Sequence, residues 1–141
     1  MFYYSYSAAI TGMEANLIHV EADVNEGLPF FQIVGFLSSE VKEAKERVRI
    51  AIQNSSFRFP NKKVTINLSP ADIHKAGTSF DLGIAAAILC GMGVLMQEDL
   101  ENVRILGELG LDGSVGRISG VLPMVLLAKE RGLKTCIVPK E

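Results

Sequence analysis

One polar segment places several reactive side-chain types directly before an apolar helix. It reads Ser69-Pro70-Ala71-Asp72-Ile73-His74-Lys75-Ala76-Gly77-Thr78-Ser79-Phe80-Asp81-Leu82. The pattern predicts that Ser79 lies at the helix N-terminus, beside unpaired backbone N–H groups and the positive end of the helix dipole. A nucleophile or an anion site would use that setting. An ordinary N-cap serine would use it as well, so both interpretations stand.

Hydrolysis by Ser79 would require a base, because a serine hydroxyl is a weak nucleophile near neutral pH. Lys75 and Lys129 are candidates, but either would have to reach Ser79 and be desolvated enough to be neutral. We therefore favour a capping or structural Ser79. Asp81, expected in the first turn of the helix, is suited to accept backbone N–H bonds there. A structural role is favoured for Asp81, and for Asp72, because no paired acid or metal-ligand cluster surrounds them in the sequence.

The histidines and cysteines do not form a recognisable metal or redox motif. His19 alternates with Glu21 and Asp23, and this trio could hold a metal, although an ordinary solvated strand face is favoured. His74 is expected in a loop. Cys90 and Cys136, the two cysteines, each lie in an apolar run and are expected to be buried, reduced thiols. No metal and no cofactor are expected in this chain.

Basic residues are concentrated in one stretch of an otherwise slightly acidic chain. The formal net charge is -2 and the pI is about 5.7, which gives no global reason to expect a polyanionic partner. Residues 42–63 nevertheless contain seven basic side chains and two acidic ones, Glu43 and Glu46. Those we assign as candidate nucleic-acid-binding residues are Lys42, Lys45, Arg49, Lys62 and Lys63. The first three recur at helical spacing and could neutralise phosphates without reading sequence, which predicts weak, salt-sensitive DNA binding.

The alternative is a solvated helix face in which Glu43 and Glu46 pair with Arg47 and Lys42. The charges alone do not decide between the two interpretations.

Hydrophobic periodicity predicts strands and helices that interleave without a strict βαβ rhythm. Alternation predicts strands over about 3–10, 17–24, 30–34 and 64–68. A helix should begin near Ser38 or Ser39, with a buried stripe of Val41, Ala44, Val48, Ala51 and Ile52. A buried helix is expected over about 79–90, an Asp-Gly hairpin between 103–108 and 115–118, a helix over 120–131 and a strand over 134–138. This pattern predicts an α+β fold, with a layered mixed sheet and helices.

Length and composition favour one domain over residues 1–141. The chain has 141 residues, of which 48% are hydrophobic, enough for one sizeable core. No apolar run approaches the roughly 18 residues of a membrane span and no secretion signal is recognisable, so a cytoplasmic protein without membrane contact is expected. The chain stops directly after its last expected strand, which suggests a fragment of a longer chain.

Several segments together resemble the N-terminal domain of the magnesium chelatase-like ATPases of the ComM/YifB type. They cover nearly the whole chain in order: Tyr6-Ser7-Ala8-Ala9-Ile10, Gly27-Leu28-Pro29, Ile33-Val34-Gly35, Val41-Lys42-Glu43-Ala44-Lys45-Glu46-Arg47-Val48-Arg49, Ile66-Asn67-Leu68-Ser69-Pro70-Ala71-Asp72, Phe80-Asp81-Leu82, Leu106-Gly107-Glu108-Leu109 and Val121-Leu122-Pro123. The resemblance implies a fold shared with the proteolytic domain of Lon and the C-terminal domain of RadA, itself related to GHMP kinases.

In that family the domain precedes an AAA+ ATPase module, and the full protein is thought to be a hexameric DNA translocase or branch-migration helicase in natural transformation. The resemblance therefore implies DNA and further copies of the chain as partners. It also implies ATP and Mg²⁺ in a following ATPase module. This chain contains no Gly-Lys dipeptide, so the phosphate-binding Walker A loop is absent from it. We expect a non-catalytic accessory domain; a residual serine hydrolase and a purely structural interaction module are the alternatives.

The same resemblance bears on Ser79. Gly77-Thr78-Ser79 is similar to the Gly-Pro-Ser of the Lon proteolytic site, which places Ser79 at the position of Lon's nucleophile. Matching Lon's Gly-Gly-Leu-Lys to Ser119-Gly120-Val121-Leu122 puts Leu122 at the position of the lysine base. Because an aliphatic side chain accepts no proton, the resemblance implies a vestigial serine.

Overall fold

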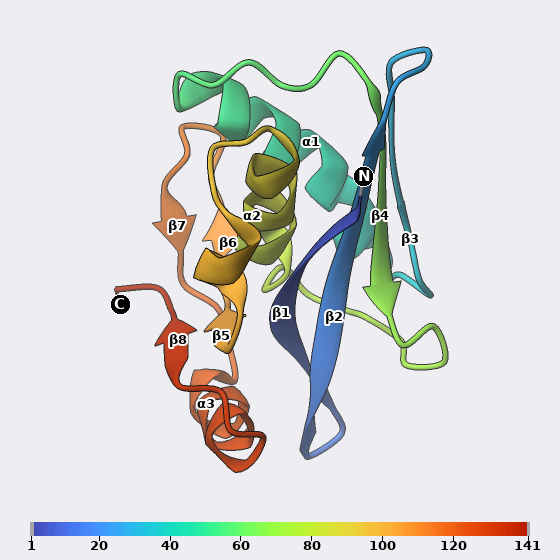
Figure 1. Ribbon diagram of the computed structural model, residues 1–141. Helices are drawn as coiled ribbons and strands as arrows, with labels where there is room; N and C mark the ends of the chain where they lie inside the picture. The colour runs from blue at the N-terminus through green and yellow to red at the C-terminus, as the bar shows by residue number, and fades with distance from the viewer. Residues whose placement is uncertain (1, 141) are drawn as a thin grey trace.

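A six-stranded mixed sheet with two helices on one face forms the body of the protein (Figure 1). The computed structural model describes residues 2–140. The strands lie in the order β3-β4-β2-β1-β5-β8, and β1 pairs antiparallel with β2 and parallel with β5. Their bounds are β1 Phe2–Thr11, β2 Glu14–Asn25, β3 Phe30–Val34, β4 Lys63–Ser69, β5 Val103–Ile105 and β8 Thr135–Ile137. The α+β class expected from the sequence is confirmed.

The central strands have one apolar and one polar face, as their alternating sequences require. Along β2 the apolar residues Ile18, Val20, Ala22 and Val24 are buried. They pack with Val64, Ile66 and Leu68 of β4 beneath helices α1 (Ser39–Asn54) and α2 (Asp81–Gly91). Strand β3 pairs with β4 alone, in parallel, and so forms one edge of the sheet next to α1.

Helix α1 begins and packs as its sequence predicts. Ser38 is the N-cap, and its Oγ accepts a hydrogen bond from the Val41 N–H at 3.4 Å. All five residues of the expected stripe, Val41, Ala44, Val48, Ala51 and Ile52, are buried. The opposite face of the helix, which carries the charged residues, is left to the solvent.

Helix α2 is buried on nearly every side, which explains its lack of a polar face. Gly83 allows the helix to approach β1 closely, since a Cβ there would lie 3.4 Å from Ser5 Oγ. The Ser5 hydroxyl donates to the Gly83 carbonyl oxygen at 2.8 Å. Strand and helix are thereby fixed side by side at the end of α2 where the polar segment arrives.

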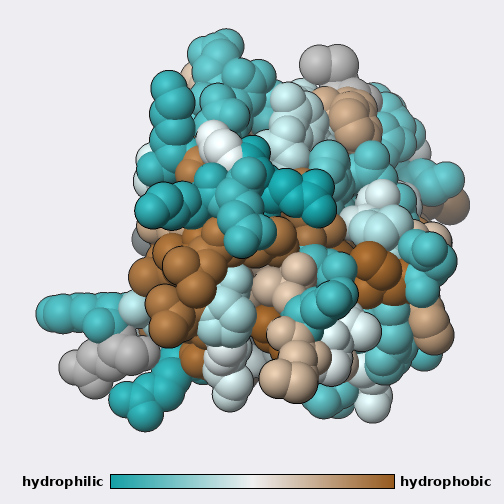
Figure 2. Space-filling view, turned by 90° about the horizontal axis from the view of Figure 1, so that it is seen from below, coloured by the Kyte–Doolittle hydropathy of each residue, from teal (hydrophilic) through white to brown (hydrophobic). Residues whose placement is uncertain are grey.

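The C-terminal third adds a hairpin and a third helix. The hairpin pairs β6 (Glu108–Leu109) with β7 (Val115–Gly116), and the Asp112 carboxylate accepts from Ser114 within its turn. The 3-10 helix η1 (Gln97–Leu100) precedes β5. Helix α3 (Val121–Glu130) lies at the lower end of the sheet and buries Met124 against Ala8 and Leu106. Its outer surface contributes to an apolar band (Figure 2) and includes Leu122, which is 68% exposed.

The structure differs from the sequence expectations at two places in this region. The expected strand 103–108 is two elements, because Gly107 turns away from the sheet and its N–H donates to the Ser79 carbonyl oxygen at 3.1 Å. Cys90 is buried as expected, but Cys136 is only half-buried, since β8 is the second edge of the sheet. None of the described helices is long and apolar enough to cross a membrane.

Candidate nucleic-acid interface and the Ser79 hollow

Ser79 does not cap helix α2. The N-cap is Phe80, and no side chain accepts a hydrogen bond from the first turn in the manner of a cap. Instead the Leu82 N–H donates to the Gly107 carbonyl oxygen at 3.1 Å, so the turn is held by the segment between β5 and β6. The Ser79 side chain is buried, and its Oγ donates to the Ala8 carbonyl oxygen at 3.4 Å. Of the two roles favoured for Ser79, capping is therefore wrong, because a backbone segment distant in sequence occupies that place, and the structural role remains.

A hollow of about 390 Å³ lies over Ser79, and we refer to it as the Ser79 hollow. Its lining residues are Ile10, Ala76, Gly77, Thr78, Ser79, Ile118, Ser119, Gly120 and Met124. The two segments that resemble the Lon site thus meet in space. Within residues 2–140 the lining includes no lysine, histidine or carboxylate, and Leu122 is not part of it.

The two lysines considered as bases are not hydrogen-bonded to Ser79. Lys75 is completely buried, and its Nζ donates to the carbonyl oxygens of Gly35, at 2.6 Å, and Pro70. Burial lowers the pKa of Lys75. Lys129 is exposed in the last turn of α3. Lys75 therefore ties the polar segment to the end of β3, a role that the sequence pattern did not predict.

Asp81 joins α2 to α1 and to the hairpin. Its side chain is 1% exposed, and Arg47 donates to both carboxylate oxygens, Nε at 2.7 Å and Nη2 at 3.0 Å. The Leu109 N–H donates to the same carboxylate at 3.0 Å. Burial raises the pKa of Asp81, while Arg47 and the Leu109 N–H oppose that shift. This geometry supports a structural role for Asp81 and shows that Arg47 does not pair with Glu43 or Glu46.

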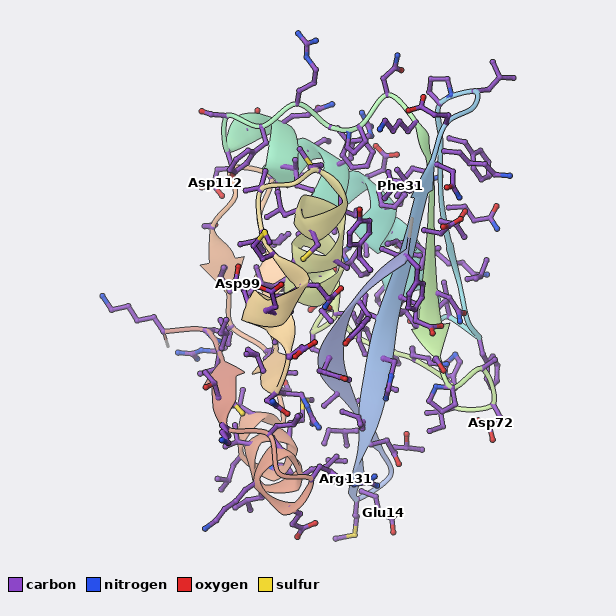
Figure 3. The ribbon with its side chains drawn as sticks, viewed as in Figure 1. Glu14, Phe31, Asp72, Asp99, Asp112 and Arg131 are labelled. Atoms are coloured by element: carbon purple, nitrogen blue, oxygen red, sulfur yellow. The ribbon has the colours of Figure 1, made fainter. Side chains whose placement is uncertain are left out.

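The five candidate DNA-binding residues gather around the edge strand β3, on a surface that we call the β3 groove. It consists of three adjoining hollows that share Phe30. Two lie toward α1, with volumes of about 300 Å³ and 280 Å³, and are lined by Lys42, Lys45, Arg49 and Lys62 together with Phe30, Phe31 and Phe59. The third, of about 810 Å³, includes Lys63, Gln32 and Thr65. Phe31 is labelled in Figure 3, where β3 approaches α1.

The charges of the β3 groove are only partly compensated. Arg49 pairs with Glu46, and Lys62 Nζ lies 3.2 Å from a Glu26 carboxylate oxygen. Both pairs are solvent-exposed, and such pairs contribute about 0–1 kcal/mol, so an incoming phosphate can compete for these cations. Among the described residues neither Lys42 nor Lys45 forms an ion pair. The groove therefore offers a local positive surface on an acidic protein.

Phe30 was not among the residues predicted to have a functional role, although the sequence contains a signal for its exposure. Successive strand side chains point to opposite faces, so one member of the Phe30-Phe31 pair must leave the core. Phe31 packs against the core and contacts Phe59, with ring centroids 5.1 Å apart, whereas Phe30 is 47% exposed.

The remaining candidates lie on the surface of the sheet or in loops. His19 is exposed and packs edge-on against the Tyr6 ring, and Glu21 accepts a hydrogen bond from Asn67 at 2.7 Å. No group of three possible metal ligands occurs among residues 2–140. His74 packs against Phe36, with ring centroids 4.7 Å apart, and Asp72 is exposed at the tip of its loop (Figure 3).

Comparison with known proteins decides the family. A profile of the family described as subunit ChlI of Mg-chelatase matches residues 20–141. The chain belongs to this family. Within it, the chain is 38% identical over 136 residues to competence protein ComM of Haemophilus influenzae, covering 96% of this chain and 26% of ComM. It is 39% identical over 132 residues to the uncharacterised protein YifB of Escherichia coli, covering 94% of this chain and 26% of YifB.

The ChlI-family chain also resembles Lon more distantly. It is 26% identical over 139 residues to the Lon protease of Mycolicibacterium smegmatis, covering 94% of this chain and 18% of that protease. This similarity agrees with the meeting of the two Lon-like segments at the Ser79 hollow. The chain spans about a quarter of the length of ComM and YifB.

Proposed function

We propose that this ChlI-family domain is a non-catalytic, DNA-contacting domain of a ComM-like AAA+ ATPase. The observation that carries the proposal is the β3 groove. Basic side chains of α1 lie there beside Lys62 and Lys63, the residues immediately before and at the start of β4. The local sequence pattern does not predict that these two segments are neighbours. Cations grouped on one surface bind the phosphate backbone, and the release of condensed counterions favours this binding. Such contacts do not depend on the base sequence.

The relatives support a proposal about the whole protein. One of them carries the name competence protein, and they are about four times as long as this chain. We propose that the parent is a hexameric, cytoplasmic ATPase that moves along DNA or migrates branches in natural transformation. ATP and Mg²⁺ would be bound by its other module, and this domain would hold DNA and support assembly.

DNA contact is tested by reversing charge in the groove. In the triple variant Lys42→Glu, Lys45→Glu and Arg49→Glu, we expect affinity for a fluorescent DNA oligonucleotide to fall at least about tenfold at low salt. A matched control reverses Lys129, Lys134 and Lys140, which are exposed and lie outside the groove. Both variants change the net charge equally, so equal losses in the two would refute a specific groove.

Assembly is tested separately by light scattering after size exclusion. We expect the isolated chain to be monomeric or weakly associated and a longer chain containing the ATPase module to form a hexamer with nucleotide. A longer chain that stays monomeric with both ATP and DNA present would refute the assembly part of the proposal and leave the DNA contact intact.

A further inference from the structure

Phe30 combines exposure, an edge position and cationic neighbours on two sides. It is the first residue of β3 and pairs in register with Lys63 of β4. On the α1 side of β3 the hollows that it lines hold Lys42, Lys45 and Arg49. Isolated exposed apolar residues are common and need no explanation. An aromatic ring shared by three hollows, each of which also holds at least one basic side chain, is a more specific arrangement.

Such an arrangement discriminates between single and double strands. Proteins that bind single strands combine a positive groove, which follows the backbone, with aromatic rings on which bases stack. In a duplex the base faces are already stacked on one another, so an external ring cannot reach them without base flipping. The cations of the β3 groove can act on either form, whereas the Phe30 ring can act only on unpaired bases.

We propose that the β3 groove binds single-stranded DNA across the sheet edge, with a base stacked on Phe30. The phosphates of the nucleic acid lie along Lys42, Lys45 and Arg49. The base stacked on Phe30 extends over the edge of β3 toward the hollow that contains Gln32, Lys63 and Thr65. Gln32 and Thr65 offer amide and hydroxyl groups to base edges there. The inference rests on the proposed DNA contact and adds to it the state of the strand.

The central experiment measures Phe30→Ala binding to an oligothymidine and to a duplex of equal length by fluorescence anisotropy. Loss of one base stack should weaken single-strand binding about 5- to 150-fold and leave duplex binding unchanged within about twofold. Phe2→Ala is the matched control, because Phe2 is 59% exposed on β1, which β4 and β2 separate from β3. Equal effects of the two variants on the oligothymidine would overturn the inference.

A second variant reports stacking directly. The chain contains no tryptophan, so Phe30→Trp introduces a single indole at the groove. We expect oligothymidine to quench its fluorescence and duplex to leave it unchanged, with single-strand affinity at least that of the wild type. An unquenched indole in a variant that binds the oligothymidine would overturn the stacking inference even if Phe30→Ala failed to fold.

The outcomes separate this inference from the proposed function. If the α1 charge reversals abolish binding while Phe30→Ala is silent, the stacking inference fails and the DNA contact stands. If both are silent, both fail. Oligouridine is tested in parallel, because a stacked base can come from DNA or RNA. A Phe30-dependent loss confined to RNA would overturn the assignment to DNA.

Discussion

The buried pair of Arg47 and Asp81 yields a quantitative prediction about stability. The Asp81 side chain is 1% exposed, whereas that of Arg47 is 19% exposed. Removing Arg47 leaves a buried carboxylate whose remaining donor is the Leu109 N–H, a change that costs about 3–5 kcal/mol. Removing the charge of Asp81 instead leaves the Arg47 guanidinium without its partner, but this group is partly exposed and can be hydrated. We therefore expect Arg47→Met to lower the free energy of unfolding by about 3–5 kcal/mol and Asp81→Asn by about 1–2 kcal/mol.

Urea denaturation of both single variants and of the double variant measures the coupling between the two side chains. The double variant should be more stable than Arg47→Met alone, because the amide oxygen introduced by Asp81→Asn still accepts from the Leu109 N–H and no charge remains buried. The pH provides a second test. Burial already raises the pKa of Asp81 and should raise it further without Arg47.

A folded-state carboxyl pKa above the unfolded value means that the folded chain binds the proton more tightly. Stability then falls as pH rises through the folded pKa and recovers as pH falls toward the ordinary carboxyl range. The deficit of Arg47→Met relative to wild type should therefore shrink as pH falls toward the ordinary carboxyl value of about 4. Equal costs for the two single variants, or a deficit independent of pH, would refute the reasoning about the buried charge.

Three further predictions concern the polar segment and the sheet. Ser79→Ala should leave peptide and ester hydrolysis at the buffer background and cost less than about 1 kcal/mol, because the Ser79 hydroxyl makes one long hydrogen bond; serine-dependent turnover would contradict this. Gly35→Ala should cost at least about 2 kcal/mol in thermal unfolding, since φ is +125° and a Cβ would overlap the Leu68 carbonyl oxygen, whereas Gly116→Ala should be mild. Because burial lowers the pKa of Lys75, the unfolded chain binds that proton more strongly, so wild-type stability relative to Lys75→Met should rise between about pH 8 and about pH 10; a constant difference would contradict a buried amine.

The sequence predicted the elements whose local pattern and tertiary setting agree. The α1 stripe ending at Ala51 and Ile52 and the alternation along β2 each follow from burial of one face. The hairpin at Asp112 and Gly113 follows from turn chemistry, with φ of +88° at Gly113. These patterns also sufficed for the α+β class.

Features that depend on contacts distant in sequence were not predictable in this way. Arg47 and Asp81 are separated by 34 positions, and local helix spacing offered only glutamates as partners for Arg47. Ser79 looked like a cap because the sequence does not show that Gly107 binds the first turn of α2. Lys75 was considered from the sequence only as a base for Ser79, but its Nζ donates to the Gly35 carbonyl oxygen beyond the end of β3. In each case a partner distant in sequence decides the role of the residue.

Only the α1 part of the candidate DNA interface could be predicted from the sequence, because only that part depends on local spacing. Lys42, Lys45 and Arg49 lie on one helix face by spacing alone. Their proximity to Lys62 depends on how β3 and β4 pair beside α1, which the sequence does not encode locally.

The salt dependence of DNA binding tests the account most directly. The β3 groove offers five cations, and release of about 0.7 counterion per neutralised phosphate on a single strand predicts a slope of log K against log salt near about -3.5. Engagement of Arg49 and Lys62 by Glu46 and Glu26 would reduce it toward about -2. We predict a slope between these values for the wild type and one shallower by about 1.4 to 2.1 units for the α1 charge-reversal variant, according to whether Arg49 is engaged by Glu46. A slope near zero, or the same slope in both proteins, would contradict DNA contact through this groove.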